Sequence, residues 1–279
     1  MKKNILLTIE YDGSSFHGWQ RQPDRPTVQG HLEEALSSLL REKISLNGTS
    51  RTDAGVHALG QRASFETSSG IPAGRVALAV NNALRSREEG AFAGSPVRVI
   101  SSEEKPVGFH ARFDSKGKRY IYRIRNSAVN DVFSRNYVYH VDRPLDVAAM
   151  KEAAACLEGV HDFKSFEASG GTPRKTTVRR IFDLDVVETG RNNDKRTAGD
   201  GLSIPGKEAA AGFSGDIEIS VSGDGFLYNM VRIIVGTLVD IGLGKMMPGT
   251  MTDIMEARDR RAAGHTAPPY GLYLAEVYY

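Results

Sequence analysis

The sequence predicts an α+β fold made of two halves that share one order of strands and helices. Apolar residues alternate with polar ones in several short segments, as in half-buried strands, and recur every three or four positions in the segments between them, as in helices. A chain of 279 residues with 40% apolar and 25% charged residues can form one large or two ordinary domains. We place the boundary between residues 104 and 105, so the halves comprise residues 1–104 and 105–279.

The first half begins with a strand in which Ile5, Leu7 and Ile9 share one face. Thr27 is expected to cap a helix whose apolar stripe runs from Val28 to Leu40. The expected elements are strands at 4–11, 44–47, 62–67 and 97–100 and helices at 28–40 and 75–84. This order of strand, helix, strand, strand, helix and strand is that of a ferredoxin-like or RRM-like unit.

The second half has the same order, with Asp146 expected to cap its first helix. The expected elements are strands at 119–126, 181–188, 217–222 and 272–278 and helices at 147–157, 230–241 and 252–261. Two such halves suggest a pseudo-twofold pair with adjoining sheets and a central active-site cleft. The segment 189–215 lacks periodicity and is rich in Gly, Asn, Lys, Arg and Ala, so we expect a mobile hairpin extension there.

Composition narrows the class of protein. The formal net charge of +2 is too small to indicate nucleic-acid binding, so any basic surface must come from local clustering. Cys156 is the only cysteine, which excludes an internal disulfide, and no Cys or His spacing indicates a metal site. The N-terminal apolar run is broken at Thr8 and Glu10, and the run at 230–243 is too short to span a bilayer. A cytoplasmic protein with no membrane partner is therefore expected.

The segment 48–61 concentrates chemically active side chains between two expected strands. Arg51, Thr52, Asp53 and His57 supply a cation, a hydroxyl, a carboxylate and an imidazole, with glycines around them that free the backbone. Loops held between strands often carry catalysis, so the segment is a candidate active site. The alternative is an ordinary turn, in which Asp53 bonds backbone amides and the nearby glycine is left-handed.

Arg232 lies in an apolar helical pattern, where an unpaired guanidinium would carry a large desolvation penalty. Asp240 is two turns away along the same helix, so Asp53 is the more economical partner. The alternative is an arginine whose stem is buried and whose head reaches solvent.

Basic and aromatic residues are interleaved in the strand 119–126 and in the loop 13–26. In the strand, Arg119, Arg123 and Arg125 share one face and Tyr120 and Tyr122 the other. Such mixtures suit RNA phosphates and unstacked bases, although a solvated charged face over a tyrosine core is an equal alternative. The loop carries His17, Trp19, Arg21 and Arg25, with the tryptophan either stacking on a ligand or covering a core edge. The basic clusters at 174–180 and 258–261 either contact phosphates or are solvated faces.

The run Arg-Thr-Asp-Ala-Gly-Val-His-Ala, residues 51–58, resembles the signature of the TruA family of tRNA pseudouridine synthases. Further matching blocks, at compatible spacings, lie at residues 11–20, 27–29, 109–113, 120–122, 225–232 and 271–274. The resemblance implies that the protein converts uridine to pseudouridine at positions 38 to 40 of the tRNA anticodon arm, after flipping the base. It also implies a homodimer that binds one tRNA across both subunits. No cofactor and no metal are expected.

The same resemblance implies roles for individual residues. Asp53 would be the nucleophile, Arg232 its ion-pair partner, and Tyr120 the residue that stacks on the target uridine and assists proton removal from C5. Arg51 would hold the flipped nucleotide or fill its place. The implied substrate-binding residues are Tyr120, Arg51, Thr52, His57, Arg112 and Arg119.

The chain departs from the family pattern in three places. Ser50 stands where many members have Gly, the segment 81–97 lacks a Leu-Pro-x-Asp-Ile pattern, and the extension at 189–215 is unusual. Two other classes of function are compatible with parts of the sequence. A non-catalytic RNA-binding protein would have no need of Asp53 and Arg232, and a glycoside hydrolase would need a second acid, for which Glu66 is the nearby candidate.

Overall fold

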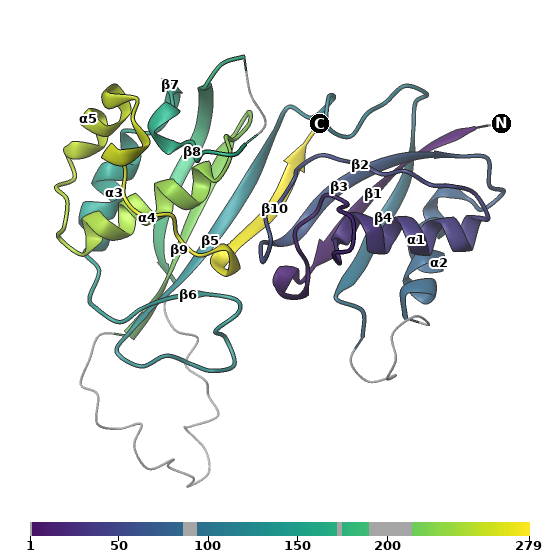
Figure 1. Cartoon of the computed structure of the whole chain (residues 1–279), viewed down its shortest axis with the longest axis horizontal. Coiled ribbons are helices and arrows are strands. Elements are labelled where there is room, and N and C mark those ends of the chain that lie inside the picture. The colour runs from purple at the N-terminus through teal and green to yellow at the C-terminus, as the bar shows by residue number, and fades with distance from the viewer. Residues whose placement is uncertain (1, 86–93, 172–174, 190–213) are drawn as a thin grey trace, which may run out of the picture. The chain divides into compact units, whose positions relative to one another are not determined.

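The computed structural model describes residues 2–85, 94–171, 175–189 and 214–279. Across these residues, five α-helices and a large mixed β-sheet form the predicted α+β fold (Figure 1). Contacts divide the chain into unit 1, Met1–Tyr120 with Tyr273–Tyr279, and unit 2, Ile121–Leu272. These bounds differ from a division after residue 104, because the chain leaves unit 1 inside a strand and returns to it for its last strand.

Unit 1 contains a four-strand path in the order β4-β1-β3-β10. Its elements are β1 (Lys3–Tyr11), α1 (Val28–Leu40), β2 (Asn47–Gly48), β3 (His57–Thr67), α2 (Ala73–Arg85), β4 (Val97–Lys105) and β10 (Leu272–Tyr278). β1 is antiparallel to β3 and β4, β10 is parallel to β3, and the short β2 also pairs with β3. α2 packs on β4 and on α1.

The sequence pattern explains the core of unit 1. Ile5, Leu7 and Ile9 of β1 are fully buried, as their alternation predicts. The Thr27 hydroxyl accepts a hydrogen bond from the Gly30 N–H at 3.3 Å, so the predicted N-cap of α1 is confirmed.

Two predictions around the candidate loop are wrong in their bounds. The strand expected at 44–47 is reduced to Asn47–Gly48. The Leu46 N–H donates to the Glu33 carboxylate of α1 at 2.9 Å, so it is not available to a neighbouring strand. β3 begins at His57 and not at residue 62, since pairing with β1 extends as far as Tyr11 and Ala58. The loop is therefore confined to residues 49–56.

Unit 2 contains strands in the order β5-β9-β8-β7, with α3 packed on α4 and on β8. Its elements are β5 (Gly117–Ser127), β6 (Tyr139–Val141), α3 (Val147–Ala155), β7 (Gly159–Asp162), β8 (Val178–Thr189), β9 (Ser214–Gly223), α4 (Met230–Gly242) and α5 (Thr250–Ala257). The predicted cap Asp146 accepts from the Ala149 N–H at 2.9 Å. The last predicted helix ends at Ala257, not at 261, because Arg258 is left-handed.

β8 and β9 pair antiparallel, as predicted. Within the expected extension at 189–215, residues 190–213 lie outside the described part of the chain. None of the helices in the described ranges has the length and apolar character that crossing a membrane requires.

Candidate active site

The loop that carries Asp53 is anchored at its start by the buried side chain of Gln61. The Gln61 amide donates to the Ser50 carbonyl at 2.8 Å and accepts from the Ser50 N–H at 3.2 Å. Gln61 is 0% exposed, so the bonds are shielded from water. One residue earlier, the Thr49 N–H bonds the Arg62 carbonyl at 2.9 Å. The loop is thus tied to β3 along its first residues.

A second loop, before α1, holds the same segment from another side. The Trp19 N–H donates to the Thr52 carbonyl at 3.1 Å. Gly18 has a φ of +91°, and a Cβ there would lie 2.6 Å from that carbonyl oxygen. A Cβ at Gly48 would lie 2.3 Å from the Trp19 indole nitrogen, which shows how closely the ring covers the loop entrance. Trp19 was predicted either to stack on a ligand or to cover an edge of the core. Because its side chain is 1% exposed, covering the core is the correct role.

Asp53 begins a tight turn. The Val56 N–H donates to the Asp53 carbonyl at 3.2 Å, and Gly55 has a φ of +78°. The turn proposed as the alternative to a site is therefore present, but backbone atoms close it. The Asp53 side chain is half-buried at its first corner.

Thr52 and His57 hold this turn in place. The Thr52 hydroxyl lies 2.7 Å from the Tyr11 hydroxyl, and both side chains are buried. His57 is buried, accepts from the Gly13 N–H on Nδ1 at 3.1 Å and stacks on Tyr273 with 4.8 Å between ring centroids. These contacts give both residues a positioning role.

Tyr120, at the end of unit 1, brings a phenol to the loop. Burial raises the pKa of Tyr120 to about 12, a hydrogen bond with Ser50 opposes this rise, and the negative charge of Asp53 adds to it. The effect of the Asp53 charge on this pKa indicates that the two side chains lie near each other. The Ser50 hydroxyl also accepts from the Lys118 ammonium at 2.8 Å. The site in unit 1 thus combines a carboxylate, a neutral phenol, a hydroxyl and an ammonium group.

Three arginines of unit 1 were predicted to bind the substrate, and their surroundings differ. Arg51 is exposed on the loop, and the Arg112 guanidinium lies 6.0 Å from the centroid of the Phe113 ring. Arg119 pairs with Glu276 at 3.3 Å. Because side chains alternate along β5, Arg119 lies on the face opposite to Tyr120.

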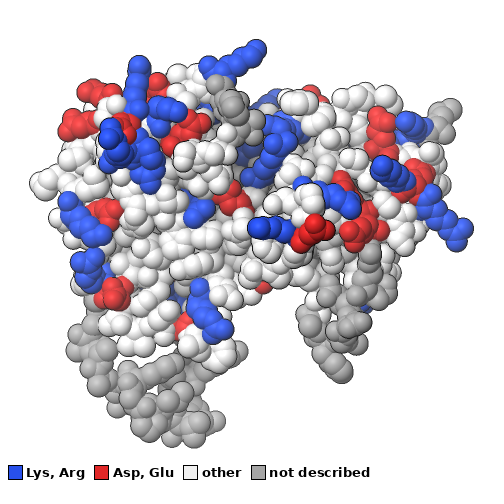
Figure 2. Space-filling view, in the orientation of Figure 1, with Lys and Arg blue, Asp and Glu red and all other residues white. Residues whose placement is uncertain are grey.

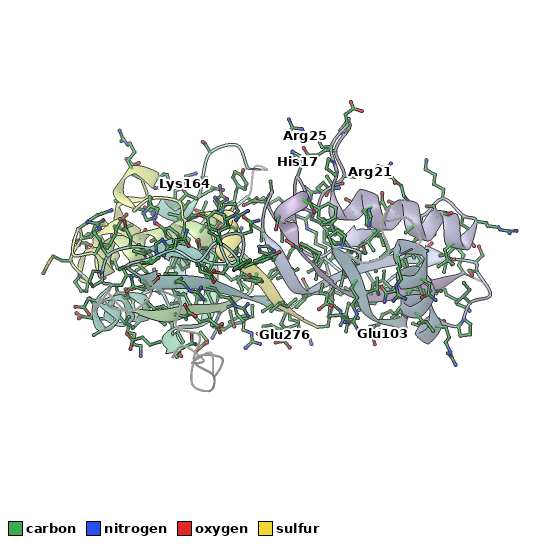
Figure 3. All side chains as sticks on the ribbon, turned by 90° about the horizontal axis from the view of Figure 1, so that it is seen from below. His17, Arg21, Arg25, Glu103, Lys164 and Glu276 are labelled. Carbon is green, nitrogen blue, oxygen red and sulfur yellow. The ribbon has the colours of Figure 1, made fainter. Side chains whose placement is uncertain are left out.

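Charged side chains lie on both faces of unit 1. Figure 3 shows His17, Arg21 and Arg25 on the loop before α1, on the opposite side of the unit from Glu103 and Glu276. Ion pairs occur on both sides, since Arg62 pairs with Glu103 at 2.6 Å and Arg21 with Glu33 at 3.1 Å. The loop before α1 also contains Gly18 and Trp19, so it is attached to the Asp53 segment.

Arg232 belongs to α4 in unit 2. Its guanidinium donates to the Ala267 carbonyl and to the Asn229 side-chain oxygen, each at 2.8 Å. Asp240 has partners of its own, Lys245 at 2.7 Å and His265 at 2.9 Å, in agreement with its exclusion as the partner of Arg232. An ion pair between Arg232 and Asp53 stays a prediction.

Other basic residues of unit 2 are paired within the unit. Arg125 bonds Asp216 at 3.0 Å and Asp131 at 3.1 Å, and Arg123 lies 3.7 Å from Glu218. In the cluster at 258–261, Arg258 pairs with Asp162 at 3.1 Å and Arg261 with Asp259 at 2.6 Å. These ion pairs favour the alternative that the arginines of the strand 119–126 and of the cluster 258–261 form solvated charged faces.

Sequence reasoning missed Ser50, Lys118, Gln61 and Tyr11 as parts of the site. Strand alternation could have found Lys118, because it lies two residues before Tyr120 on the same face of β5. Tyr11 and Gln61 are brought to the loop by the pairing of β1 with β3, which no local pattern reveals.

The second acid of a glycoside hydrolase is not where that class requires it. Glu66 stands opposite Asn4 near the far end of β3 and pairs with Lys2 at 3.4 Å. Eight residues of β3 lie between it and His57, where the strand leaves the loop.

A fixed loop that presents a carboxylate beside a buried phenol, in an α+β protein, is characteristic of an enzyme. Comparison with known proteins specifies the class. A family model for tRNA pseudouridine synthase matches residues 7–114 and 153–279. The tRNA pseudouridine synthase A of Acetivibrio thermocellus is 43% identical over 277 residues, which cover 99% of this chain and 100% of that relative. The tRNA pseudouridine synthase A 2 of Clostridium tetani is 41% identical over 281 residues, with 100% of both chains covered.

A protein of the same description from Clostridium perfringens is 42% identical over 277 residues, covering 99% of this chain and 100% of the relative. The similarity extends through both units and includes the segment that carries Asp53. The chain therefore belongs to the tRNA pseudouridine synthase family, whose members are isomerases that act on tRNA.

Proposed function

We propose that the protein isomerises uridine to pseudouridine at positions 38 to 40 of the tRNA anticodon arm, with Asp53 as the nucleophile. The observation that supports this most directly is the electrostatic interaction of Asp53 with Tyr120 beside the anchored loop. The site choice rests on the resemblance to the family.

The reaction breaks the bond between ribose C1′ and N1 of uracil and forms a bond between C1′ and C5. The proton on C5 leaves, N1 gains a proton, and no electrons are exchanged with another molecule, so the reaction needs no redox cofactor. The Asp53 carboxylate attacks either the ribose carbon or the pyrimidine ring, and it is released when the new bond forms. A fixed carboxylate lowers the barrier because its position is established before the substrate binds.

The role proposed for Tyr120 is to contact the uracil ring as a neutral phenol. Its pKa, raised to about 12 by burial, keeps the hydroxyl protonated near neutral pH. A phenolate that removes the C5 proton is therefore disfavoured, and stacking or hydrogen bonding by the phenol is favoured. Ser50 bonds and orients the hydroxyl, and the Lys118 ammonium in turn donates to Ser50 at 2.8 Å.

The target base must leave its stack before a side chain can reach C1′ or the ring. Arg51, exposed on the loop beside Asp53, is the residue that we propose holds the flipped nucleotide or fills its place. Arg112 is proposed to contact phosphate. Thr52 and His57 support the turn, and Arg119, which pairs with Glu276 on the face of β5 opposite to Tyr120, is not part of this proposal.

Arg232 is proposed to stabilise the negative charge of Asp53, and this part rests on the resemblance and on the cost of an unpaired arginine in an apolar helix. The resemblance also supports a homodimer that grips one tRNA across both subunits. Light scattering at working concentration should give the mass of two chains, and an active monomer would contradict the dimer.

We also propose that each unit is a ferredoxin-like half. In unit 1 the order β4-β1-β3, with β2 next to β3, together with α1 and α2, supports this assignment. In unit 2 the order β5-β9-β8-β7 with α3 and α4 is the corresponding support.

Replacing Asp53 with Asn tests the proposed chemistry. The amide keeps the size of the side chain and its ability to accept a hydrogen bond, and a backbone bond also closes the turn, so the fold should persist. Pseudouridine formation in unmodified tRNA should fall by roughly a thousandfold or more, because the nucleophile is gone. Binding of tRNA should stay equal or become slightly tighter with an unchanged salt dependence, since phosphate contacts to Lys and Arg supply most of the affinity.

Two outcomes would contradict the proposal. Near-normal turnover by Asp53→Asn would reduce Asp53 to a turn residue. Wild-type protein that binds tRNA and forms no pseudouridine would identify the non-catalytic RNA-binding protein considered from the sequence. Glu66→Gln is a matched control, because it also replaces a carboxylate with an amide, at the far end of β3 from the loop.

A further inference from the structure

Phe113 is an aromatic side chain that the fold leaves in water. It is 76% exposed, at the tip of the turn His110–Asp114 in unit 1. A side chain of this size contributes little to stability when it is not buried, and an exposed aromatic ring is the kind of group on which bases stack.

The turn that carries Phe113 is tightly bonded. The N–H groups of Phe113 and Asp114 both donate to the His110 carbonyl at 3.1 Å. The Asp114 carboxylate in return accepts from the His110 N–H at 2.7 Å. The tip of the turn is therefore held in one conformation and does not have to be ordered by a ligand.

The root of the turn is fixed next to the Asp53 loop. Ala111 is fully buried, and its N–H donates to the Ser64 hydroxyl of β3 at 3.1 Å. The Ala111 carbonyl accepts from the Thr49 hydroxyl at 3.0 Å and from the Tyr279 hydroxyl at 2.8 Å. Thr49 is the first residue of the Asp53 loop, so the exposed ring is coupled to the candidate site through one buried residue.

The surroundings of the ring are aromatic and basic. His110 lies against Phe113, with 4.2 Å between ring centroids and 31° between ring planes. The Arg112 guanidinium is 6.0 Å from the same ring, and the exposed Lys116 follows three residues later in the chain. Figure 2 shows Lys and Arg side chains on the visible surface of the molecule. Such a combination fits an aromatic ligand that carries negative charge.

We propose that Phe113, supported by His110, is a stacking platform for an unpaired base of the tRNA, separate from the uridine that reacts at Asp53. This inference rests on the proposed function, and it adds a second point at which the substrate is held. Bases stack on aromatic side chains irrespective of their identity, while nearby Lys and Arg bind the phosphates on either side. A second copy of this chain is disfavoured as the occupant, because two identical basic surfaces would repel each other.

The test compares two substitutions of Phe113 that are both compatible with the fold. Phe113→Leu keeps an apolar side chain and removes the ring, whereas Phe113→Tyr keeps the ring. Phe133, another phenylalanine, is 89% exposed in unit 2 and provides the matched control Phe133→Leu. The measured quantity is the dissociation constant for an unmodified tRNA transcript as a function of salt concentration, with thermal melting to verify each variant.

Phe113→Leu should weaken tRNA binding by roughly five- to a hundredfold, the range that loss of one base-stacking contact produces. Its salt dependence should match that of the wild type, because no phosphate contact is lost. Phe113→Tyr and Phe133→Leu should bind within about twofold of the wild type, a difference of less than ~0.5 kcal/mol.

Equal binding by Phe113→Leu and wild type would overturn the platform, as would an equal loss in Phe133→Leu. A loss of binding accompanied by dissociation of a dimer, seen by light scattering, would identify the ring as a contact between subunits and also overturn it. Pseudouridine formation by the wild type is assayed in parallel. Its failure, with tRNA binding still sensitive to Phe113→Leu, would refute the proposed function and leave the platform standing.

Discussion

Replacing Gly18 with Ala should separate the geometry of the Asp53 loop from the stability of the protein. Gly18 has a φ of +91°, and an added Cβ would lie 2.6 Å from the Thr52 carbonyl oxygen and 3.2 Å from the Ala54 N. Real Cβ atoms do not approach backbone oxygen this closely, so either the loop before α1 or the Asp53 turn must move. The moved atoms are within one residue of the proposed nucleophile.

The chain contains a matched control for this substitution. Gly108 has the same φ of +91°, but a Cβ there would meet no heavy atom within 4 Å. Both variants pay the cost of a left-handed alanine, about 1–2 kcal/mol. Gly18→Ala should lose a further 1–3 kcal/mol or so from the steric overlap. A displacement of the loop by about 1 Å should reduce turnover by about a hundredfold.

Urea unfolding and single-turnover pseudouridine formation measure the two effects. We expect Gly108→Ala to retain turnover close to the wild-type value and Gly18→Ala to lose both stability and turnover, while tRNA binding changes little. If the two variants had the same stability and the same turnover, the contact between Gly18 and Thr52 would not position Asp53.

Two further predictions concern the ionisable side chains Tyr120 and Arg232. Because burial raises the pKa of Tyr120 from 10 to about 12, its contribution to stability is complete below pH 10 and is lost as pH rises toward 12. When the pH rises from 9.5 to 11.5, the free energy of unfolding, measured in urea, should therefore fall by about 2 kcal/mol less in Tyr120→Phe than in the wild type. An equal fall in both proteins would contradict the shifted pKa. Arg232→Ala should destabilise the protein, and adding Asp53→Ala should restore part of the loss, with a coupling of at least about 1 kcal/mol. Strict additivity in this cycle would mean that the two residues do not interact.

Most of the regular elements could be predicted because their signals are local. The helix from Val28 follows from a capping threonine and an apolar stripe, and the last strand has the predicted bounds, Leu272–Tyr278. The short strands β6 and β7 were not predicted. β6 has only three residues, too few for an alternation to be recognised.

The end of the loop illustrates what a local pattern cannot supply. His57 to Gln61 contains Gly60 and reads as irregular, yet it forms the first half of β3. A Cβ at Gly60 would lie 2.4 Å from the Ala275 carbonyl oxygen of β10, more than 200 residues later in the chain, so a close approach of two strands requires this glycine. The sequence shows a glycine and gives no sign of the strand that it contacts.

The sequence predicted only part of the candidate site, because some of its contacts join residues far apart in the chain. Asp53 and Tyr120 were found through a resemblance, whereas Ser50 was noted only as a departure from the family pattern. The structure gives that departure a physical consequence, since the Ser50 hydroxyl bonds Lys118 and Tyr120, and a glycine at this position could make neither bond. A chain with glycine there must orient the phenol by other contacts.

The turn and the active site, which stood as alternatives for residues 51–57, are compatible descriptions of the same segment. The hydrogen bond from the Val56 N–H to the Asp53 carbonyl and the left-handed Gly55 close the turn through the backbone. These two backbone features of the turn do not involve the Asp53 charge. This is why Asp53→Asn is informative, because a residue needed only for the turn would tolerate the amide, and a nucleophile would not. The bonds from Gln61, Trp19 and Gly13 make the segment rigid before substrate arrives, so the free energy of ordering it belongs to folding and not to each catalytic cycle.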